Sequence, residues 1–336
     1  MSFRINNREI VNSSRVLSSN ELKLSSGGSL VVSEIGGTVY GYNSGGVTSP
    51  ASINTIDKFP FATDAHATNV GVITGKRYGS GGNSSSTNGY SLGGFDLETS
   101  LTLNAIDRFP FAVNANATDI GDLRSTNRLG ASQSSTVSGY ISGGSGLYPT
   151  NSVQIDKFPF ASNSTITVNV GSLSQGRIYS AGHSSRVSGY TSGGQSWPSG
   201  PPRSNRIDKF PFASNSSASF VGYLSTEKAN GIAGQSSDVA GYSSGGYTPT
   251  LASNTIEKFS FASDGDASNI GNLYIGRAEL SGQSSTVAGY SSGGFSPSPS
   301  GYTNVIDKFP FATDAGSTDV GDLSGSPRGL TAGHQI

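Results

Sequence analysis

The heptapeptide IDKFPFA, residues 56–62, is the first of six closely similar strings in this chain. The other copies begin at Ile106, Ile155, Ile207, Ile256 and Ile306. Twelve of the 16 phenylalanines lie in the six FPF or FSF triplets of these strings. A disordered chain has no reason to space its aromatic residues so regularly. The sequence therefore predicts a folded repeat protein, even though 47 of its 336 residues are glycine.

Two further strings repeat with the same period. GY, followed by two residues and GG, begins at Gly41, Gly89, Gly139, Gly189, Gly241 and Gly289. A string close to AGQSS is centred on Asn83, Gln133, His183, Gln235, Gln283 and His334. Each unit contains four short strands, a to d, separated by turn-forming residues, and none shows a helical period. The pattern predicts an all-β, six-bladed β-propeller with four-stranded blades.

The two ends of the chain carry complementary fragments of one unit. GYNSGG at residues 41–46 has no clear AGQSS string before it, and AGHQ at residues 332–335 has no GYxSGG string after it. We therefore expect the C-terminal strand to complete the first blade, which would remove the open sheet edges. We assign residues 31–336 to the propeller and residues 1–30 to an N-terminal attachment or oligomerisation segment.

Composition argues against several classes of function. The net charge is −1 with no cluster of Lys or Arg, which argues against a nucleic-acid partner. No apolar run is long enough to span a membrane, and no secretory signal is evident. The chain has no Cys and only three His, and it lacks GxSxG and HExxH motifs. We therefore expect no catalytic residues, no cofactor and no metal, and a protein that is not an enzyme.

The repeated residues have structural interpretations. We expect the Ile and Phe of each IDKFPFA string to fill the gaps between blades, and its Asp and Lys to pair across blades or face solvent. The AGQSS-type centres are expected to make structural hydrogen bonds, either lining the central channel or bonding to the adjacent blade's backbone. Asp64, Asp264 and Asp314 in the c–d turns hint at calcium, but Asp is an ordinary turn residue and no EF-hand spacing is present.

The b–c loops differ most between units, and loops on a rigid scaffold commonly carry function. They contain the aromatic residues outside the repeated core. We predict that these residues form a ligand-binding face: Trp197, Tyr148, Tyr247, Phe95, Phe295 and Tyr302. The alternative is that their rings fold down over the edges of the blades.

The double glycine, the aromatic residue after it and the Arg before each innermost strand resemble the kelch repeat. Arg77, Arg177, Arg277 and Arg328 lie six residues before an AGQSS-type centre, although the usual kelch Trp in strand d is missing. The near-identical units also resemble repeat proteins of marine bacteriophages, cyanophages especially. The N-terminal stretch RINNREIVNSSRVLSSNELKL resembles the segments that open phage tail-fibre and spike proteins.

These resemblances imply a non-enzymatic virion surface protein, such as a tail-fibre or tail-associated adhesin or a structural binding module. Residues 1–30 would then attach to other virion proteins or to sister subunits, and the propeller would present a face to a host-surface glycan or protein. The alternative is a glycosidase-like carbohydrate-active enzyme on the same scaffold. A pair of carboxylates within ~10 Å in a cleft would favour the enzyme.

Overall fold

The computed structural model describes residues 3–5, 8–11, 36–146, 152–162, 165–196 and 203–336. The chain forms two compact units, Met1–Glu34 and Ile35–Ile336. In the first unit, β1 (Phe3–Ile5) and β2 (Arg8–Val11) pair as antiparallel strands. The described residues of the second unit form strands and no helix, which confirms the all-β prediction.

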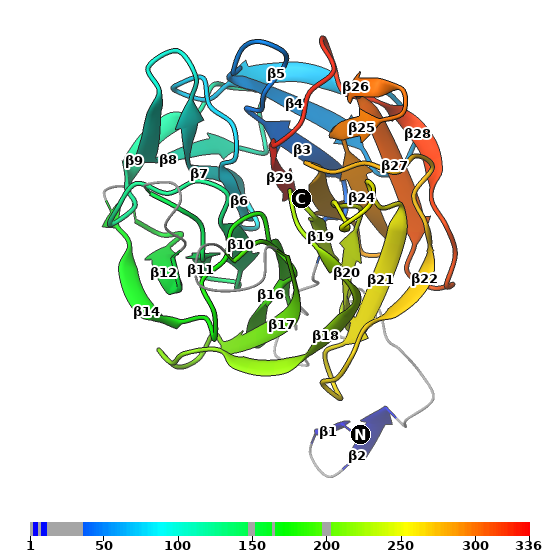
Figure 1. The fold of residues 1–336 in the computed structure, drawn as a ribbon. Coiled ribbons are helices and arrows are strands. Elements are labelled where there is room, and N and C mark those ends of the chain that lie inside the picture. The colour runs from blue at the N-terminus through cyan, green and yellow to red at the C-terminus, as the bar shows by residue number, and fades with distance from the viewer. Residues whose placement is uncertain (1–2, 6–7, 12–35, 147–151, 163–164, 197–202) are drawn as a thin grey trace. The chain divides into compact units, whose positions relative to one another are not determined.

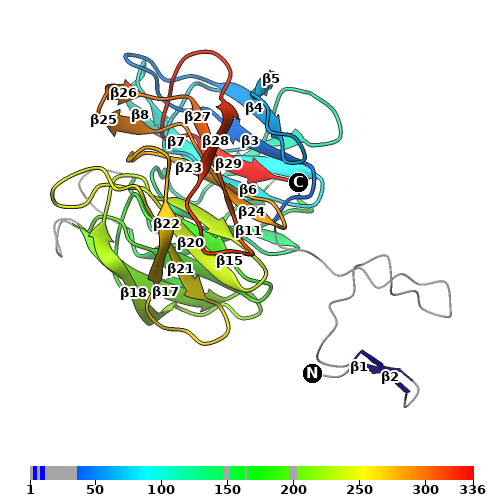
Figure 2. The same cartoon turned by 90° about the vertical axis from the view of Figure 1, so that its right-hand side faces the viewer.

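Six antiparallel sheets, the blades, surround a central axis in the second unit (Figures 1 and 2). The innermost strands a are β29 (Ala332–Gln335), β6 (Gly81–Ser84), β10 (Ala131–Ser134), β15 (Ala181–Ser184), β19 (Ala233–Ser236) and β23 (Ser281–Ser284). The strands b are β3 (Tyr40–Ser44), β7 (Asn88–Asp96), β11 (Ser138–Ser142), β16 (Ser188–Ser192), β20 (Ala240–Ser244) and β24 (Ala288–Ser292). The predicted six-bladed propeller is confirmed.

The two outer strands complete each blade. The strands c are β4 (Thr55–Pro60), β8 (Leu101–Pro110), β12 (Gln154–Pro159), β17 (Ser204–Pro211), β21 (Thr255–Ser260) and β27 (Val305–Pro310). The strands d are β5 (Thr68–Val72), β9 (Thr118–Asp122), β14 (Val168–Ser172), β18 (Ser219–Lys228), β22 (Ser268–Asn272) and β28 (Thr318–Asp322). Short β13 (Thr165–Ile166) joins β9 in parallel, and β25 (Phe295–Pro297) and β26 (Ser300–Tyr302) form a hairpin.

The C-terminal strand closes the ring as predicted. β29 pairs antiparallel with β3, with His334 opposite Tyr42, so the first blade contains strands from both ends of the propeller sequence. The backbone N–H groups of Val39 and Tyr40 both donate to the Ile336 carbonyl, at 2.6 and 2.9 Å. The seam is therefore joined by the same antiparallel a–b pairing as the other blades.

Aromatic stacks fill the gaps between blades. At the closing seam, Tyr290 of β24 stacks on Phe61, with ring centroids 4.7 Å apart, and its hydroxyl donates to the Phe61 carbonyl at 3.4 Å. Every other gap holds the same Tyr–Phe–Phe combination, formed by Tyr42 with Phe109 and Phe111, Tyr90 with Phe158 and Phe160, Tyr140 with Phe210 and Phe212, Tyr190 with Phe259 and Phe261, and Tyr242 with Phe309 and Phe311. The expectation that phenylalanines pack between blades is confirmed.

The packing of these phenylalanines requires a glycine in each GY pair. A Cβ atom added to Gly289 would lie 2.3 Å from the ring of Phe309, its cross-strand partner in the same blade. No larger residue leaves room for the phenylalanine at that position. The GY and FPF strings are therefore two halves of one packing unit.

In five of the six blades a buried ion pair ties the connection before strand a to strand c of the same blade. Arg77 lies 2.6 Å from Asp107, and both side chains are fully buried. The backbone N–H and hydroxyl of Thr74 also donate to Asp107. Equivalent buried pairs are Arg177–Asp208, Arg277–Asp307, Arg328–Asp57 and Lys228–Glu257. The aspartates of the IDKFPFA strings thus hold the blade together internally, whereas we expected them to pair across blades or face solvent.

Candidate functional site

The b–c loops and the d–a connections meet on one side of the propeller, here called the loop face. Isolated bridges pair Phe95 with Tyr78, and Phe295 with Ala278. Because antiparallel strands turn at alternate ends, the a–b and c–d turns lie on the opposite side, here called the turn face. The loop face therefore combines the most variable loops with the start of every strand a.

Six residues in a left-handed backbone conformation form a rim around the axis on the loop face. They are Gly79, Leu129, Tyr179, Asn230, Glu279 and Leu330, with φ angles from 52° to 65°. Hydrogen bonds join five of the six successive pairs, each from a backbone N–H to the carbonyl of the preceding rim residue, as from Leu330 to Glu279 at 2.7 Å. This conformation costs a non-glycine residue roughly 1–2 kcal/mol, and such strain gathers at functional sites.

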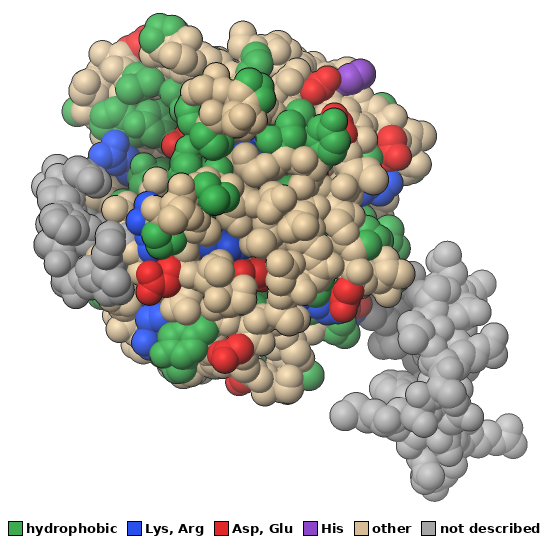
Figure 3. All heavy atoms as spheres, turned by 45° about the vertical axis from the view of Figure 1, so that its right-hand side comes forward, with side chains coloured by type: hydrophobic (Ala, Val, Ile, Leu, Met, Phe, Trp, Pro, Cys, Tyr) green, Lys and Arg blue, Asp and Glu red, His purple; other side chains and the backbone are tan. Residues whose placement is uncertain are grey.

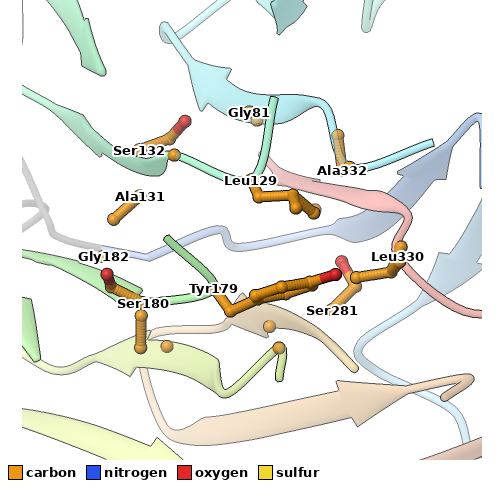
Figure 4. Close-up of a pocket in the computed structure, with 18 of the residues that line it drawn as sticks. Gly81, Leu129, Ala131, Ser132, Tyr179, Ser180, Gly182, Ser281, Leu330 and Ala332 are labelled. Atoms are coloured by element: carbon orange, nitrogen blue, oxygen red, sulfur yellow. The ribbon is translucent and has the colours of Figure 1, made fainter. Parts of the chain in front are cut away.

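The rim opens onto an axial cavity of about 120 Å³, lined by the innermost strands (Figure 4). Most of its lining residues are small, and the large side chains are those of Leu129, Tyr179, Ile232, Leu280 and Leu330. Figure 4 shows the Tyr179 ring extending across the cavity towards the side on which Leu330 lies. Deeper in, the strands approach too closely for side chains, since a Cβ atom on Gly182 would lie 2.1 Å from the Ser132 carbonyl oxygen.

The six predicted ring residues do not line this cavity, and the structure instead places them between blades. All six side chains are buried, and they bond to the backbone of the adjacent blade. His183, for example, bonds through Nδ1 to the Gln235 carbonyl and through Nε2 to the Ser192 hydroxyl. Gln133 bonds to the Ser142 hydroxyl, which is equivalent to Ser192, and to the Tyr190 carbonyl on strand b of the adjacent blade.

The two histidines of this ring are held in the neutral form. Burial lowers the pKa of His183 to about 4, although the Gln235 carbonyl partly opposes the shift. Burial likewise lowers the pKa of His334 to about 4, opposed by the Asn83 carbonyl. The ring residues therefore stabilise the contacts between blades and offer no proton donor or acceptor to a ligand.

The structure describes four of the six aromatic residues predicted to bind ligand. All four lie half-buried on the loop face: Phe95, Tyr247, Phe295 and Tyr302. Their rings are thus neither fully exposed nor completely folded down over the edges of the blades. Trp197 and Tyr148 lie outside the described residues.

Three of these aromatics have packing partners. Phe95 packs edge-on against Tyr78, with centroids 5.6 Å apart, and lies 4.3 Å from the Arg128 guanidinium carbon. Phe295 and Tyr302 pack edge-on across the β25–β26 hairpin at 5.6 Å. Each ring is thus fixed in place while part of it stays accessible.

A carboxylate that the sequence did not single out lies among these aromatics. The Tyr302 hydroxyl donates to Glu279 Oε2 at 3.1 Å, and burial raises the pKa of Glu279. The pKa of Tyr302 is raised by burial and by Glu279, with smaller effects from Tyr78 and Tyr179. Burial and Glu279 also raise the pKa of Tyr247. We call Glu279 and these four tyrosines the Glu279 cluster.

Within the described part of the chain, nothing neutralises Glu279. No basic side chain and no second carboxylate contributes to its pKa there. Its other oxygen, Oε1, accepts no hydrogen bond from any described residue. The rim position is Gly, Leu, Tyr or Asn in other blades, so the sequence gives no repeated signal that would have identified Glu279.

The aspartates considered as calcium ligands have other partners. Asp64, Asp264 and Asp314 each lie 2.9 Å from a lysine of the preceding blade's strand c, namely Lys308, Lys209 and Lys258 respectively. These lysines therefore pair across blades, as expected. The described residues contain no group of three His, Asp or Glu arranged to hold a metal ion.

The turn face has a different character. Four valines at the a–b turns are 66–69 % exposed, and we call them the valine ring: Val137, Val187, Val239 and Val287. The first described residues of the propeller also lie here, because Gly37 donates to the Ser284 carbonyl at 2.7 Å and accepts from Thr286 at 3.0 Å. The side of the molecule drawn in Figure 3 is largely uncharged, with hydrophobic groups and scattered acidic and basic side chains.

Neither a membrane-spanning helix nor a similar known protein gives further information about the site. None of the described residues forms a helix that is long and apolar enough to cross a membrane. No protein-family model matches the chain, and a search of curated proteins finds no match either.

Proposed function

We propose that this chain is a non-enzymatic virion surface protein of a bacteriophage, a tail-fibre or tail-associated adhesin or structural binding module. Its loop face contacts a glycan or protein on the host surface. The observation that carries the proposal is the Glu279 cluster at the strained rim, where a rim carboxylate bonds to a half-buried aromatic residue of a variable loop on a rigid scaffold. The kelch-like, phage-like repeats and N-terminal stretch supply the biological setting.

A binding role accounts for the loop face better than glycoside hydrolysis does. Hydrolysis by the usual route needs two carboxyl groups flanking the scissile bond. Glu279 is not coupled to a second carboxylate in the described residues. Aromatic rings held by their neighbours, in contrast, are well suited to the flat faces of sugars or to a protein surface.

The two faces of the propeller suit two separate roles, attachment on the side of the turn face and recognition on the loop face. Residues 36–39 lie on the turn face, which also carries the valine ring. Attachment through residues 1–30, to other virion proteins or to sister subunits, would leave the loop face directed outward. Short strands such as β1 and β2 can gain affinity by adding to a partner's sheet edge.

The test of recognition is adsorption of the full-length protein to host cells. A variant with Phe95, Tyr247 and Trp197 changed to Ala should fold but adsorb weakly. Val187→Ser, on the turn face, is the matched control and should adsorb normally. If the triple variant melts normally and adsorbs as well as the unaltered protein, the recognition surface lies elsewhere.

The test of attachment is removal of residues 1–30. The truncated protein should sediment as a folded monomer and should fail to join the particle in a co-assembly assay. Incorporation at the normal level would place the attachment site on the propeller and refute this part of the proposal.

A further inference from the structure

Glu279 is partly buried, and its carboxyl group has no basic partner among the described residues. Burial of an ionised carboxylate is costly unless a cation or several hydrogen-bond donors compensate for it. Glu279 has one donor, the Tyr302 hydroxyl at 3.1 Å, and no basic partner among the described residues. By contrast, Asp107 is buried against Arg77 and Thr74, which shows how this fold treats a purely structural carboxylate.

The surroundings of Glu279 favour binding of a positively charged ligand. Aromatic rings present a negative face that attracts cations, and the attraction grows when water is excluded. Tyr78, Tyr179, Tyr247 and Tyr302 approach Glu279 or one another closely enough to affect the cluster's pKa values. The carboxyl group of Glu279, bonded to the Tyr302 hydroxyl, thus offers an ion-pair partner beside an aromatic residue.

We propose that the Glu279 cluster binds the ammonium group of a ligand, and that this ligand is an amino sugar of a host-surface glycan. The ammonium group would donate to Oε1 of Glu279, the oxygen that accepts no hydrogen bond from the described chain. Tyr302 would hold the carboxylate in position through Oε2. The choice of an amino sugar rests on the proposed function, whereas the choice of an ammonium group rests on the site itself.

The rim explains how the rest of such a ligand is accommodated. Leu129 and Leu330 border the axial cavity and provide apolar contact for the face of a sugar ring. The Tyr179 ring, which extends across the cavity, offers a second flat surface (Figure 4). The strained, hydrogen-bonded rim fixes these groups before the ligand arrives, which lowers the entropic cost of binding.

The experiment compares four small ligands on the full-length protein, by calorimetric or NMR titration at pH 7.5 and low salt. Glucosamine carries the ammonium group, N-acetylglucosamine replaces it with a neutral amide, glucose lacks it, and choline carries a quaternary ammonium without a sugar. Glucosamine should bind roughly tenfold or more tightly than the two neutral sugars. Glu279→Gln, which keeps an acceptor for Tyr302, should remove that preference, whereas Val287→Ser on the turn face should retain it.

Each result has a clear meaning. Equal binding of glucosamine and N-acetylglucosamine, or an unchanged preference in the folded Glu279→Gln protein, would overturn the proposal. Choline binding more tightly than glucosamine would uphold the ammonium site and overturn the amino sugar. Host-cell adsorption measured in parallel separates the two proposals: adsorption that survives Glu279→Gln leaves the adhesin function standing while this site fails. If glucosamine binds but the protein does not adsorb to host cells, the ammonium site stands and the adhesin function fails.

Discussion

The two histidines between the blades should make the propeller sensitive to mild acid. His183 and His334 are fully buried, and burial lowers the pKa of each to about 4. In the unfolded chain each would take up a proton near pH 6.5, so the unfolded state binds more protons at intermediate pH. Stability is therefore fully present above about pH 6.5, and it falls as the pH drops towards 4.

The size of the effect follows from the pKa difference. A fall from 6.5 to about 4 corresponds to about 3 kcal/mol per histidine once both states are protonated. At pH 5 the loss is about 2 kcal/mol for each, or about 4 kcal/mol for the pair. This pH lies above most carboxylate pKa values, so the histidines should dominate the change there.

The matched variant is supplied by the repeat itself, because glutamine occupies the equivalent position in three other units. Gln133 bonds to the Ser142 hydroxyl, as His183 does to Ser192, and it also bonds to a backbone carbonyl of the adjacent blade, that of Tyr190. The double variant His183→Gln and His334→Gln should therefore keep a side-chain bond between the blades at each position. Urea unfolding at pH 7.5 and pH 5 measures the change in free energy. The unaltered protein should lose about 4 kcal/mol and the double variant much less.

The converse substitution checks the same reasoning. Gln133→His should add a third buried imidazole and increase the loss at pH 5 by about 2 kcal/mol. If the double variant loses as much stability as the unaltered protein between the two pH values, the buried histidines are not the cause of the acid sensitivity.

Four further predictions concern stability. Asp107→Asn should leave Arg77 buried without a counter-charge and cost about 3–5 kcal/mol in urea unfolding; a loss below about 1 kcal/mol would contradict this. Deletion of residues 328–336 should open the ring and cost several kcal/mol, so an unchanged melting temperature would refute closure by β29. Glu279→Gln should raise the melting temperature at pH 7.5, because burial raises the pKa of this carboxyl and the charged form opposes folding; a lower melting temperature would count against that reasoning. Gly182→Ala should prevent close approach of the innermost strands and lower the melting temperature, whereas the surface change Val187→Ser should not.

Features repeated six times could be predicted from the sequence. The strand order, the ring closure and the packing of phenylalanines between blades follow from strings that recur because every blade meets the same neighbours. The buried ion pairs were missed, although a signal was present. In one blade both partners change together, to Lys228 and Glu257, which is the substitution pattern of a contact.

The candidate site could not be predicted in the same way, because it depends on what is not repeated. The rim residues share only a backbone conformation, and their types differ from blade to blade. Glu279 meets Tyr302 through a hairpin found in one b–c loop, β25–β26. Loop aromatics could be identified as a class from the sequence, but their carboxylate partner required the three-dimensional arrangement.

The closing strand has a consequence for how the protein is made. Ser44 and His334 bond to each other although 290 residues separate them, so this contact has a high cost of chain closure and is expected to form late. Until β29 is synthesised, β3 has no inner partner. A nascent chain therefore carries an unpaired strand edge until β29 has been synthesised. A product that stops short by even one strand would keep this edge, and would be open to misassembly with its neighbours before reaching any particle.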